Sequence, residues 1–273
     1  MEAPLGESLQ DRIQKINDRR RAYVCVGLDI DPERFPAGIS SDITGAETFL
    51  RAIIDATAGH AAAYKPNLAF FLALGAEGFR LLSRLRDFLP ADTILIGDAK
   101  WGDIGNTAAM YAHTAFHQLH FDAVTLNPYQ GFDAIQPFLT DPARGAFILC
   151  RTSNPSSPEI QGTGENSLFM NVASLATGWN LNHNCGLVVG ATDPLELGLV
   201  HRQAPDLPLL IPGIGAQGGD LLACMDQLND PPPAGLLINS SRGILYAGDG
   251  SDYAHHSTRA AAALNESILN SLN

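Results

Sequence analysis

The sequence predicts a single (β/α)8 TIM barrel, of class α/β, that spans residues 1–273. Eight short apolar runs with strand character alternate with segments of helical periodicity, which is typical of a parallel sheet with a helix after each strand. No connector is long enough to mark a domain boundary, and such barrels commonly have about this length as one domain. A doubly wound open sheet is the alternative. Its glycine-rich loop would follow the first strand, whereas here that loop follows the seventh.

The expected strands are apolar along their whole length, as strands buried on both faces of a parallel sheet are. They cover residues 23–28, 61–64, 93–96, 123–126, 146–150, 187–189, 209–211 and 235–238. The expected helices cover residues 7–21, 44–60, 68–89, 104–120, 133–139, 168–182, 194–203, 221–228 and 260–272. Gly75 should break the third of these segments and Pro90 should close it. Thr44 and Glu47 have the spacing of a capping box at the start of the second helix.

Charge, apolar runs and cysteine spacing exclude several classes of protein. A net charge of −12 argues against a partner that is a nucleic acid or an anionic membrane. A phosphorylated small molecule stays possible, because a few backbone amides and one or two cations can hold a phosphate. No apolar run reaches the roughly 18 residues of a membrane-spanning helix, and we expect no signal peptide. The four cysteines lack metal-binding spacing, so we expect buried thiols in a reduced, cytoplasmic setting.

Charged residues gather where the third strand gives way to its helix. Asp98 and Lys100 are two residues apart, so both side chains should point to the same side of the strand. Asp103 should sit at the start of the helix, with Thr107 on the same helical face. A buried salt bridge plus a helix cap would explain this pattern structurally. Buried charges cost several kcal/mol unless well paired, however, and functional sites are where that cost is tolerated.

Other polar residues follow the carboxyl ends of the remaining strands, where barrels of this kind hold their active sites. These candidates are Asp29, Lys65, Asn127, Ser153, Gln217 and Arg242. The loop after strand seven contains Gly213, Gly215, Gly218 and Gly219, whose backbone amides could approach a ligand closely. The loops after strands seven and eight commonly bind phosphate in this fold, and a guanidinium such as that of Arg242 suits a phosphate. His113, His117 and His120 have near-helical spacing but no well-placed carboxylate, so we expect an exposed helix face and no metal.

Four separated blocks resemble the orotidine 5′-monophosphate decarboxylase family, in its longer bacterial-type (type 2) subfamily. They are residues 98–107 (DAKWGDIGNT), 152–155 (TSNP), 212–219 (PGIGAQGG) and 239–242 (NSSR). The strand ends at residues 28–29 and 64–67 also fit, and the likeness spans about residues 23–247. Trp101 stands where the family often has an arginine.

The resemblance implies decarboxylation of orotidine 5′-monophosphate (OMP) to uridine 5′-monophosphate (UMP) in pyrimidine biosynthesis, without metal or organic cofactor. Lys100 would stabilise the negative charge that forms at C6 of the pyrimidine and would donate the proton. Asp98 would lie against the substrate carboxylate and hold Lys100, while Lys65 and Asp29 would orient the charged groups and bind the ribose. The resemblance also implies a homodimer in which Asp103 and Thr107 reach the neighbouring subunit's site.

The same resemblance assigns the ends of the substrate. Ser153 would hydrogen-bond the pyrimidine amide edge, and Gln217 and Arg242 would hold the phosphate beside Gly215. Asn127 is expected among the substrate-binding residues of the barrel mouth. The loop over residues 156–164 is a candidate lid.

Three other functions remain as alternatives. A metal-dependent sugar-phosphate decarboxylase or synthase of the same superfamily shares the Asp-x-Lys-x-x-Asp pattern, but it needs a carboxylate ligand at the end of strand two, where this chain has Lys65. A Schiff-base aldolase would need a neutral lysine, whereas flanking carboxylates should keep Lys100 protonated. A non-catalytic uridine-phosphate binder would not need Asp98, Lys100 and Asp103 together.

Overall fold

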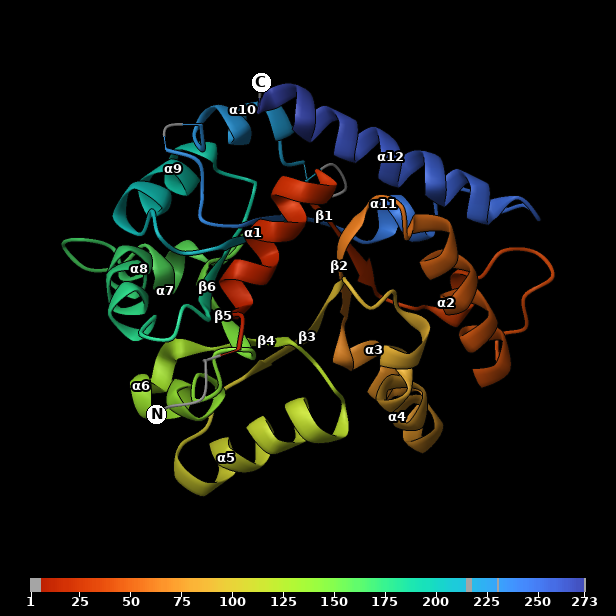
Figure 1. Cartoon of the computed structure of the whole chain (residues 1–273), viewed down its shortest axis with the longest axis horizontal. Helices are drawn as coiled ribbons and strands as arrows, with labels where there is room; N and C mark the ends of the chain where they lie inside the picture. The colour runs from red at the N-terminus through yellow and green to blue at the C-terminus, as the bar shows by residue number, and fades with distance from the viewer. Residues whose placement is uncertain (1–5, 215–217, 230, 273) are drawn as a thin grey trace.

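Eight parallel strands close into a barrel in the computed structural model of the chain, which describes residues 6–214, 218–229 and 231–272 (Figure 1). Each strand pairs with the next, and β8 pairs with β1 to complete the closure. The strands are β1 Val24–Leu28, β2 Ala61–Pro66, β3 Ile94–Trp101, β4 Ala123–Leu126, β5 Gly145–Arg151, β6 Cys185–Val189, β7 Leu209–Pro212 and β8 Leu236–Ser240. The predicted fold class is therefore confirmed.

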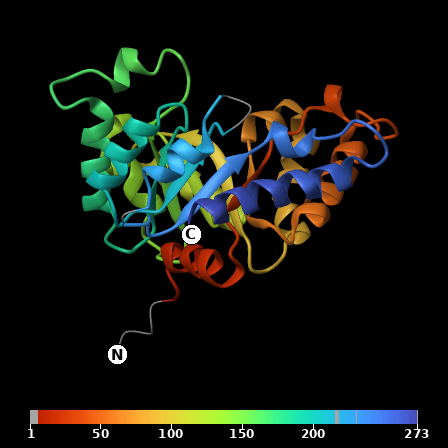
Figure 2. The same ribbon diagram turned by 90° about the horizontal axis from the view of Figure 1, so that it is seen from above.

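Helices surround the barrel on its outer side (Figures 1 and 2). The α-helices are α1 Leu9–Arg20, α2 Ile43–Thr57, α3 Leu68–Ala73, α4 Gly75–Ser83, α5 Gly105–His113, α6 Phe132–Ile135, α7 Pro158–Gln161, α8 Leu168–Trp179, α9 Pro194–Gln203, α10 Leu221–Asp226, α11 Arg242–Leu245 and α12 Tyr253–Ser271. Shorter turns are η1 Pro32–Arg34, η2 Leu85–Phe88, η3 Thr114–Gln118 (a π-helical turn), η4 Pro128–Gln130 and η5 Gln136–Phe138. Among the described residues, none of these helices has the length and apolar character needed to cross a membrane.

Two predicted helix starts were wrong. The N-cap of α2 is Asp42, whose carboxylate accepts from Gly45 N at 2.9 Å, so Thr44 lies inside the helix. Asp and Thr are both good N-caps, and the sequence alone did not separate them. Helix α12 begins at Tyr253 rather than at residue 260. Its polar first turns are held by tertiary contacts, because Ser257 Oγ donates to Ile244 O at 2.8 Å.

Helix α1 covers the amino-terminal end of the barrel, away from the carboxyl ends of the strands (Figure 2). Leu9, Ile13 and Ile16 are buried at the spacing expected for one helical face. They belong to the cluster that fills the barrel interior, whose other members include Cys25, Ala63, Ile94, Ile96, Phe147, Leu210 and Leu237. This helix therefore closes one end, leaving the opposite mouth for a ligand.

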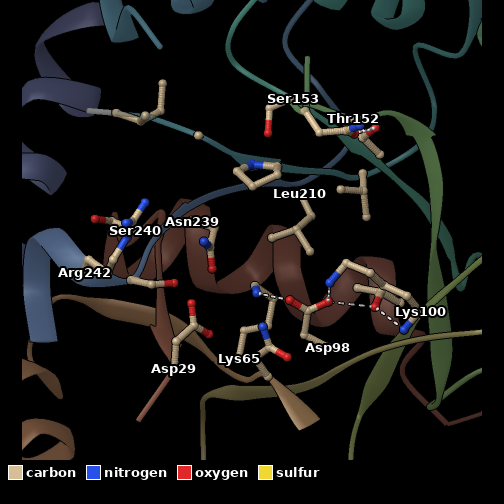
Figure 3. A pocket seen from close by; sticks show the side chains of 18 of the residues that line it. Asp29, Lys65, Asp98, Lys100, Thr152, Ser153, Leu210, Asn239, Ser240 and Arg242 are labelled. Carbon is tan, nitrogen blue, oxygen red and sulfur yellow. Dashed lines mark hydrogen bonds and ion pairs between the residues drawn. The ribbon is translucent and has the colours of Figure 1, made fainter. Parts of the chain in front are cut away.

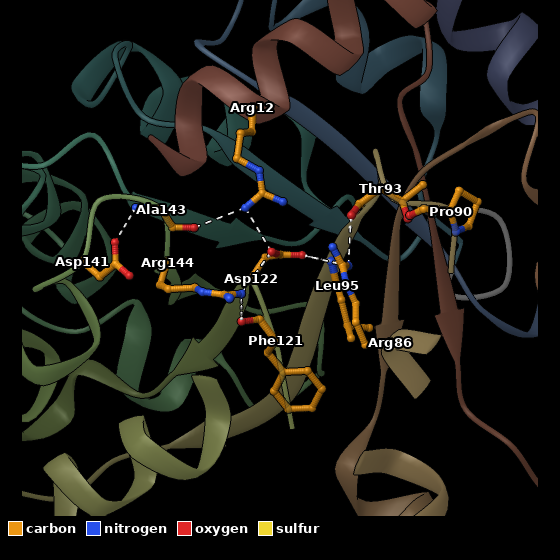
Figure 4. A network of polar contacts seen from close by, with 10 residues as sticks. All are labelled: Arg12, Arg86, Pro90, Thr93, Leu95, Phe121, Asp122, Asp141, Ala143 and Arg144. Carbon is orange, nitrogen blue, oxygen red and sulfur yellow. Dashed lines mark hydrogen bonds and ion pairs between the residues drawn. The ribbon is translucent and has the colours of Figure 1, made fainter. Parts of the chain in front are cut away.

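A buried carboxylate ties this closed end together (Figure 4). Asp122, whose side chain is 3% exposed, pairs with Arg12 of α1 at 3.0 Å, Arg86 at 3.1 Å and Arg144 at 3.2 Å. The same carboxylate accepts from the backbone amide of Leu95 in β3 at 2.8 Å. One side chain thus links the covering helix, strand β3 and the segments before β3 and β5.

Replacing Asp122 with alanine is expected to lower the free energy of unfolding by about 3 kcal/mol. This value is at the lower end of the cost of breaking a buried ion pair, because the three guanidinium groups left without Asp122 keep some access to water. Urea unfolding of both proteins measures the difference. The matched control is Asp141→Ala, which removes an exposed carboxylate that accepts, among the residues described, from the nearby Ala143 N. Equal stability of the two variants would contradict the structural role of Asp122.

Candidate active site

The carboxyl ends of the strands surround a cavity of about 770 Å³ (Figure 3). Residues from all eight strands, or from the loops that follow them, line it. The candidates that it brings together are Asp29, Lys65, Asp98, Lys100, Ser153 and Arg242. Gly215 and Gln217 lie outside the described residues.

Asp98 is the centre of the charged group in this cavity. Its carboxylate contacts Lys65 Nζ at 2.6 Å on one oxygen and Lys100 Nζ at 2.5 Å on the other (Figure 3). Thr125 Oγ1 donates a further hydrogen bond to Asp98 at 2.9 Å. The Lys65 side chain is almost fully buried, whereas that of Lys100 is 50% exposed toward the cavity. The expected meeting of Asp98 with Lys100 is thus present, and Lys65 joins them from the neighbouring strand.

The pKa values of Lys65 and Asp98 favour their charged forms at neutral pH. Burial alone would lower the pKa of Lys65, but the carboxylates of Asp98 and Asp29 outweigh burial and raise that pKa above its usual value. Burial alone would raise the pKa of Asp98, but the ammonium groups of Lys65 and Lys100 hold it well below its usual range. The site therefore carries a fixed anion between two lysines, and Lys100 has the more exposed side chain of the two.

Two buried oxygens in the cavity wall have no hydrogen-bond partner in the described part of the chain. They are Oδ1 of Asp29, just after β1, and Oδ1 of Asn239, within β8. Buried acceptors are nearly always paired, so each points to a donor supplied by a ligand. Hydroxyl or amide N–H groups would satisfy both.

The end of the cavity beside β7 and β8 suits an anion. Gly213 has φ +103°, a conformation that favours glycine, and it lines the cavity with Ser241 and Arg242. A side chain at Gly27 would meet Ser241 Oγ at 1.9 Å, so glycine is needed there for the close approach. Arg242 and Arg34 both line the cavity, and neither forms an ion pair with a carboxylate among the described residues.

The loop after β5 folds toward the cavity and contains the short helix α7. Ser153 lines the cavity, as do Thr152 and Gln161. The Gln161 amide bonds the Thr152 backbone N–H at 2.9 Å and the Thr152 hydroxyl at 2.8 Å. The outer part of this loop projects from the barrel (Figure 2). Its role as a lid stays a prediction.

Three predicted site residues do not line this cavity. Asp103 precedes Ile104, which is the N-cap of α5, so it does not cap the helix as expected; its carboxylate accepts from Ile104 N at 2.8 Å. Thr107 is exposed on α5. Asn127 is exposed, and its Oδ1 accepts from Tyr129 N at 3.0 Å, which caps η4. In one copy of the chain, none of these three residues is among those that line the cavity.

Several residues that line the cavity were not predicted as site residues, although the resembling segments contain two of them; they are Arg34, Asn67, Thr125 and Asn239. Asn67 and Asn239 are polar residues at strand ends, a signal that was available. Thr125 gave no such signal, because threonine is common within strands and does not by itself indicate a functional site. The described residues contain no group of three or more His, Cys, Asp or Glu placed to hold a metal ion, and His113, His117 and His120 are exposed.

Comparison with known proteins identifies the relatives of this chain. Residues 22–256 match the model of the orotidine 5′-phosphate decarboxylase / HUMPS family. The orotidine 5′-phosphate decarboxylase of Thermomicrobium roseum is 45% identical over 266 residues, covering 96% of this chain and 95% of the relative. That of Verminephrobacter eiseniae is 47% identical over 254 residues, covering 89% and 92%. The structure of Leishmania donovani OMP decarboxylase superposes with a TM-score of 0.83 at 39% identity, covering 97% of this chain and 99% of that one.

Proposed function

The chain belongs to the orotidine 5′-phosphate decarboxylase / HUMPS family, and from this premise we propose how its residues decarboxylate OMP. The reaction converts OMP to UMP and carbon dioxide, a step of pyrimidine biosynthesis, and the chain is an enzyme of that class. The main support for the residue assignment is the contact of Asp98 with both Lys65 and Lys100 at the mouth of the barrel.

Lys100 is the proposed electrostatic stabiliser and proton donor. When the bond from C6 to the carboxyl carbon breaks, carbon dioxide leaves and the electron pair stays on C6. An ammonium already fixed beside that carbon stabilises the developing charge without reorganisation. Lys100 then gives a proton to C6 and regains one from solvent, which its half-exposed side chain allows. This sequence of steps needs no metal and no organic cofactor.

Asp98 is proposed to lie against the substrate carboxylate. Two like charges held together disfavour the bound substrate, and this repulsion disappears once carbon dioxide forms. Asp98 can keep its charge in the complex because Lys65 and Lys100 lower its pKa. Lys65 is proposed to hold Asp98 in place and, with Asp29, to bind the ribose hydroxyls.

The remaining cavity residues are proposed to bind the two ends of the nucleotide. Arg242 is assigned to the phosphate, supported by its place in the cavity and its freedom from carboxylates. Gly215 and Gln217 are assigned to the same group on the resemblance of their block alone. Ser153 is assigned to the pyrimidine edge. Asn127 is kept as a proposed substrate contact through its amide Nδ2, since its Oδ1 accepts from Tyr129 N.

A homodimer with a shared site is the proposed assembly. Asp103 and Thr107 do not line the cavity of their own chain, so we assign them to the site of another copy. Exposed apolar side chains accompany them, since Ile104 is 50% exposed, Met110 62% and Tyr129 84%. We also propose that residues 1–273 form one domain and that the enzyme acts in the cytoplasm, in keeping with its four free, buried cysteines.

Mixing two inactive variants tests the shared site. Lys100→Ala and Asp103→Ala are each expected to have little activity as homodimers. In a heterodimer one site has the intact Lys100 of one subunit and the intact Asp103 of the other. Random reassortment of subunits should therefore restore about a quarter of wild-type activity, since half of the dimers are mixed and each has one intact site. If Asp103 served its own subunit, mixing would restore nothing.

Turnover of OMP in excess EDTA tests the proposed function against its alternatives. Loss of OMP absorbance with the purified chain supports the cofactor-free mechanism. Binding of UMP without turnover would favour a non-catalytic binder. Metal-dependent turnover of a sugar phosphate would favour the superfamily rival, and a lysine trapped covalently by borohydride would favour an aldolase.

A further inference from the structure

Thr125 connects the two central residues of the site. It lies on β4, is 1% exposed and lines the cavity. Its hydroxyl donates to Asp98 Oδ1 at 2.9 Å and accepts from the backbone N–H of Lys100 at 3.0 Å. The same carboxylate oxygen contacts Lys100 Nζ. Asp98, Lys100 and Thr125 thus form a closed ring of polar contacts.

The backbone of Lys100 needs such support. Its φ is +52°, in the left-handed region that residues other than glycine rarely adopt. Regular pairing between β3 and β4 joins Gly97 to Val124 and Trp101 to Leu126, with a register shift between them. Between these two pairs β3 advances by four residues and β4 by only two. Thr125 is the β4 residue that lies opposite this irregular stretch of β3. Its hydroxyl accepts the Lys100 N–H that this irregular pairing leaves outside the regular ladder.

We propose that Thr125 is a positioning residue for the decarboxylation: its hydroxyl holds the Lys100 backbone in the left-handed conformation and fixes the orientation of the Asp98 carboxylate. The ammonium of Lys100 is thereby aimed into the cavity rather than along the strand. This inference rests on the proposed roles of Asp98 and Lys100. A hydroxyl is required at this position, and a side chain of the same shape without one cannot replace it.

Substitution of Thr125 with valine or with serine tests whether the hydroxyl or only the shape of the side chain is needed. Thr125→Val keeps the shape but leaves the Lys100 N–H without its acceptor and removes one donor from Asp98. Thr125→Ser keeps the hydroxyl. Misplaced reacting groups commonly cost about 10- to 100-fold, so we expect kcat of Thr125→Val to fall by that factor. KM and the dissociation constant of UMP should stay unchanged, because the binding groups at the two ends of the nucleotide are untouched.

The pH profile supplies a second readout that a merely structural role would not move. A hydrogen bond donated to a carboxylate favours its charged form, so its loss should shift the acid limb of the kcat profile toward higher pH. Thr93→Val is the matched control. Thr93 is fully buried at the closed end of the barrel, and its hydroxyl donates only to Pro90 O, at 2.7 Å.

The experiment measures kcat, KM, UMP binding by calorimetry and thermal unfolding for wild type, Thr125→Val, Thr125→Ser, Thr93→Val and Lys100→Ala. The inference predicts a loss of kcat in Thr125→Val alone among the threonine variants, with recovery in Thr125→Ser. It is overturned if Thr125→Val matches wild type, if Thr125→Ser loses as much, or if UMP binding weakens in parallel. An active Lys100→Ala would instead overturn the proposed function itself.

Discussion

Replacing Lys100 with alanine is expected to lower kcat by at least about 10⁴-fold, the largest effect of any single substitution in this chain. The substitution removes both the cation that stabilises charge at C6 and the donor of the proton. UMP should still bind, because the phosphate and ribose contacts come from other residues. Steady-state kinetics and calorimetry with UMP measure the two effects separately.

The control for Lys100→Ala is Arg80→Ala, which removes an exposed cation that pairs, within the described part of the chain, with Glu77 on α4. Its kinetics should match those of the wild type. A Lys100→Ala variant that keeps a tenth or more of wild-type kcat would be incompatible with the proposed mechanism. A variant that also fails to bind UMP would point to a collapsed site rather than to lost chemistry.

Replacing Asp98 with asparagine is expected to have the second largest effect, because it changes both activity and stability. Lys65 would remain almost fully buried without its carboxylate, and breaking such a pair costs about 3–5 kcal/mol of unfolding free energy. Misplacement of Lys100 should lower kcat by about 100-fold or more. Asparagine preserves the shape, so both effects report the lost charge.

The stability effect of Asp98 has a definite pH dependence. The pKa of Asp98 is lower in the folded than in the unfolded chain, so its stabilisation is fully present above the unfolded value of about 4. It is lost as the pH falls below that value toward the folded pKa. Wild type and Asp98→Asn should therefore differ most near pH 7 and converge as the solution is acidified. Urea unfolding at several pH values measures this, and a difference independent of pH would contradict the pairing.

The strands were predictable because a barrel strand is buried on both faces and reads as an apolar run. The ends of the strands were less predictable. Strand β3 continues to Trp101, past the apolar residues 94–96, because Trp101 pairs again with Leu126 of β4 after a register shift. The alternation of side chains correctly placed Asp98 beside Lys100. It could not show the left-handed Lys100 backbone or the interrupted pairing that produces it.

Residues outside the strands were harder to predict. Asp29, Lys65, Ser153 and Arg242 reached the cavity because each lies within two residues of the carboxyl end of a strand. Asn127 also follows a strand, but its side chain caps its own loop. Arg34 lines the cavity from η1 within a longer connection, and no pattern in the sequence fixes how that connection folds. The side chains of loops depend on local hydrogen bonds that the spacing of residues does not reveal.

Lys100 is proposed to stabilise negative charge at C6 and to exchange a proton with that carbon. Because the reverse of protonation uses the same groups, the enzyme should also remove the C6 proton of its product. Proton NMR of UMP in D₂O with the wild-type enzyme and EDTA should show loss of the H6 signal, and Lys100→Ala should leave that signal intact. Exchange in Lys100→Ala as fast as in the wild type would contradict the assignment of Lys100.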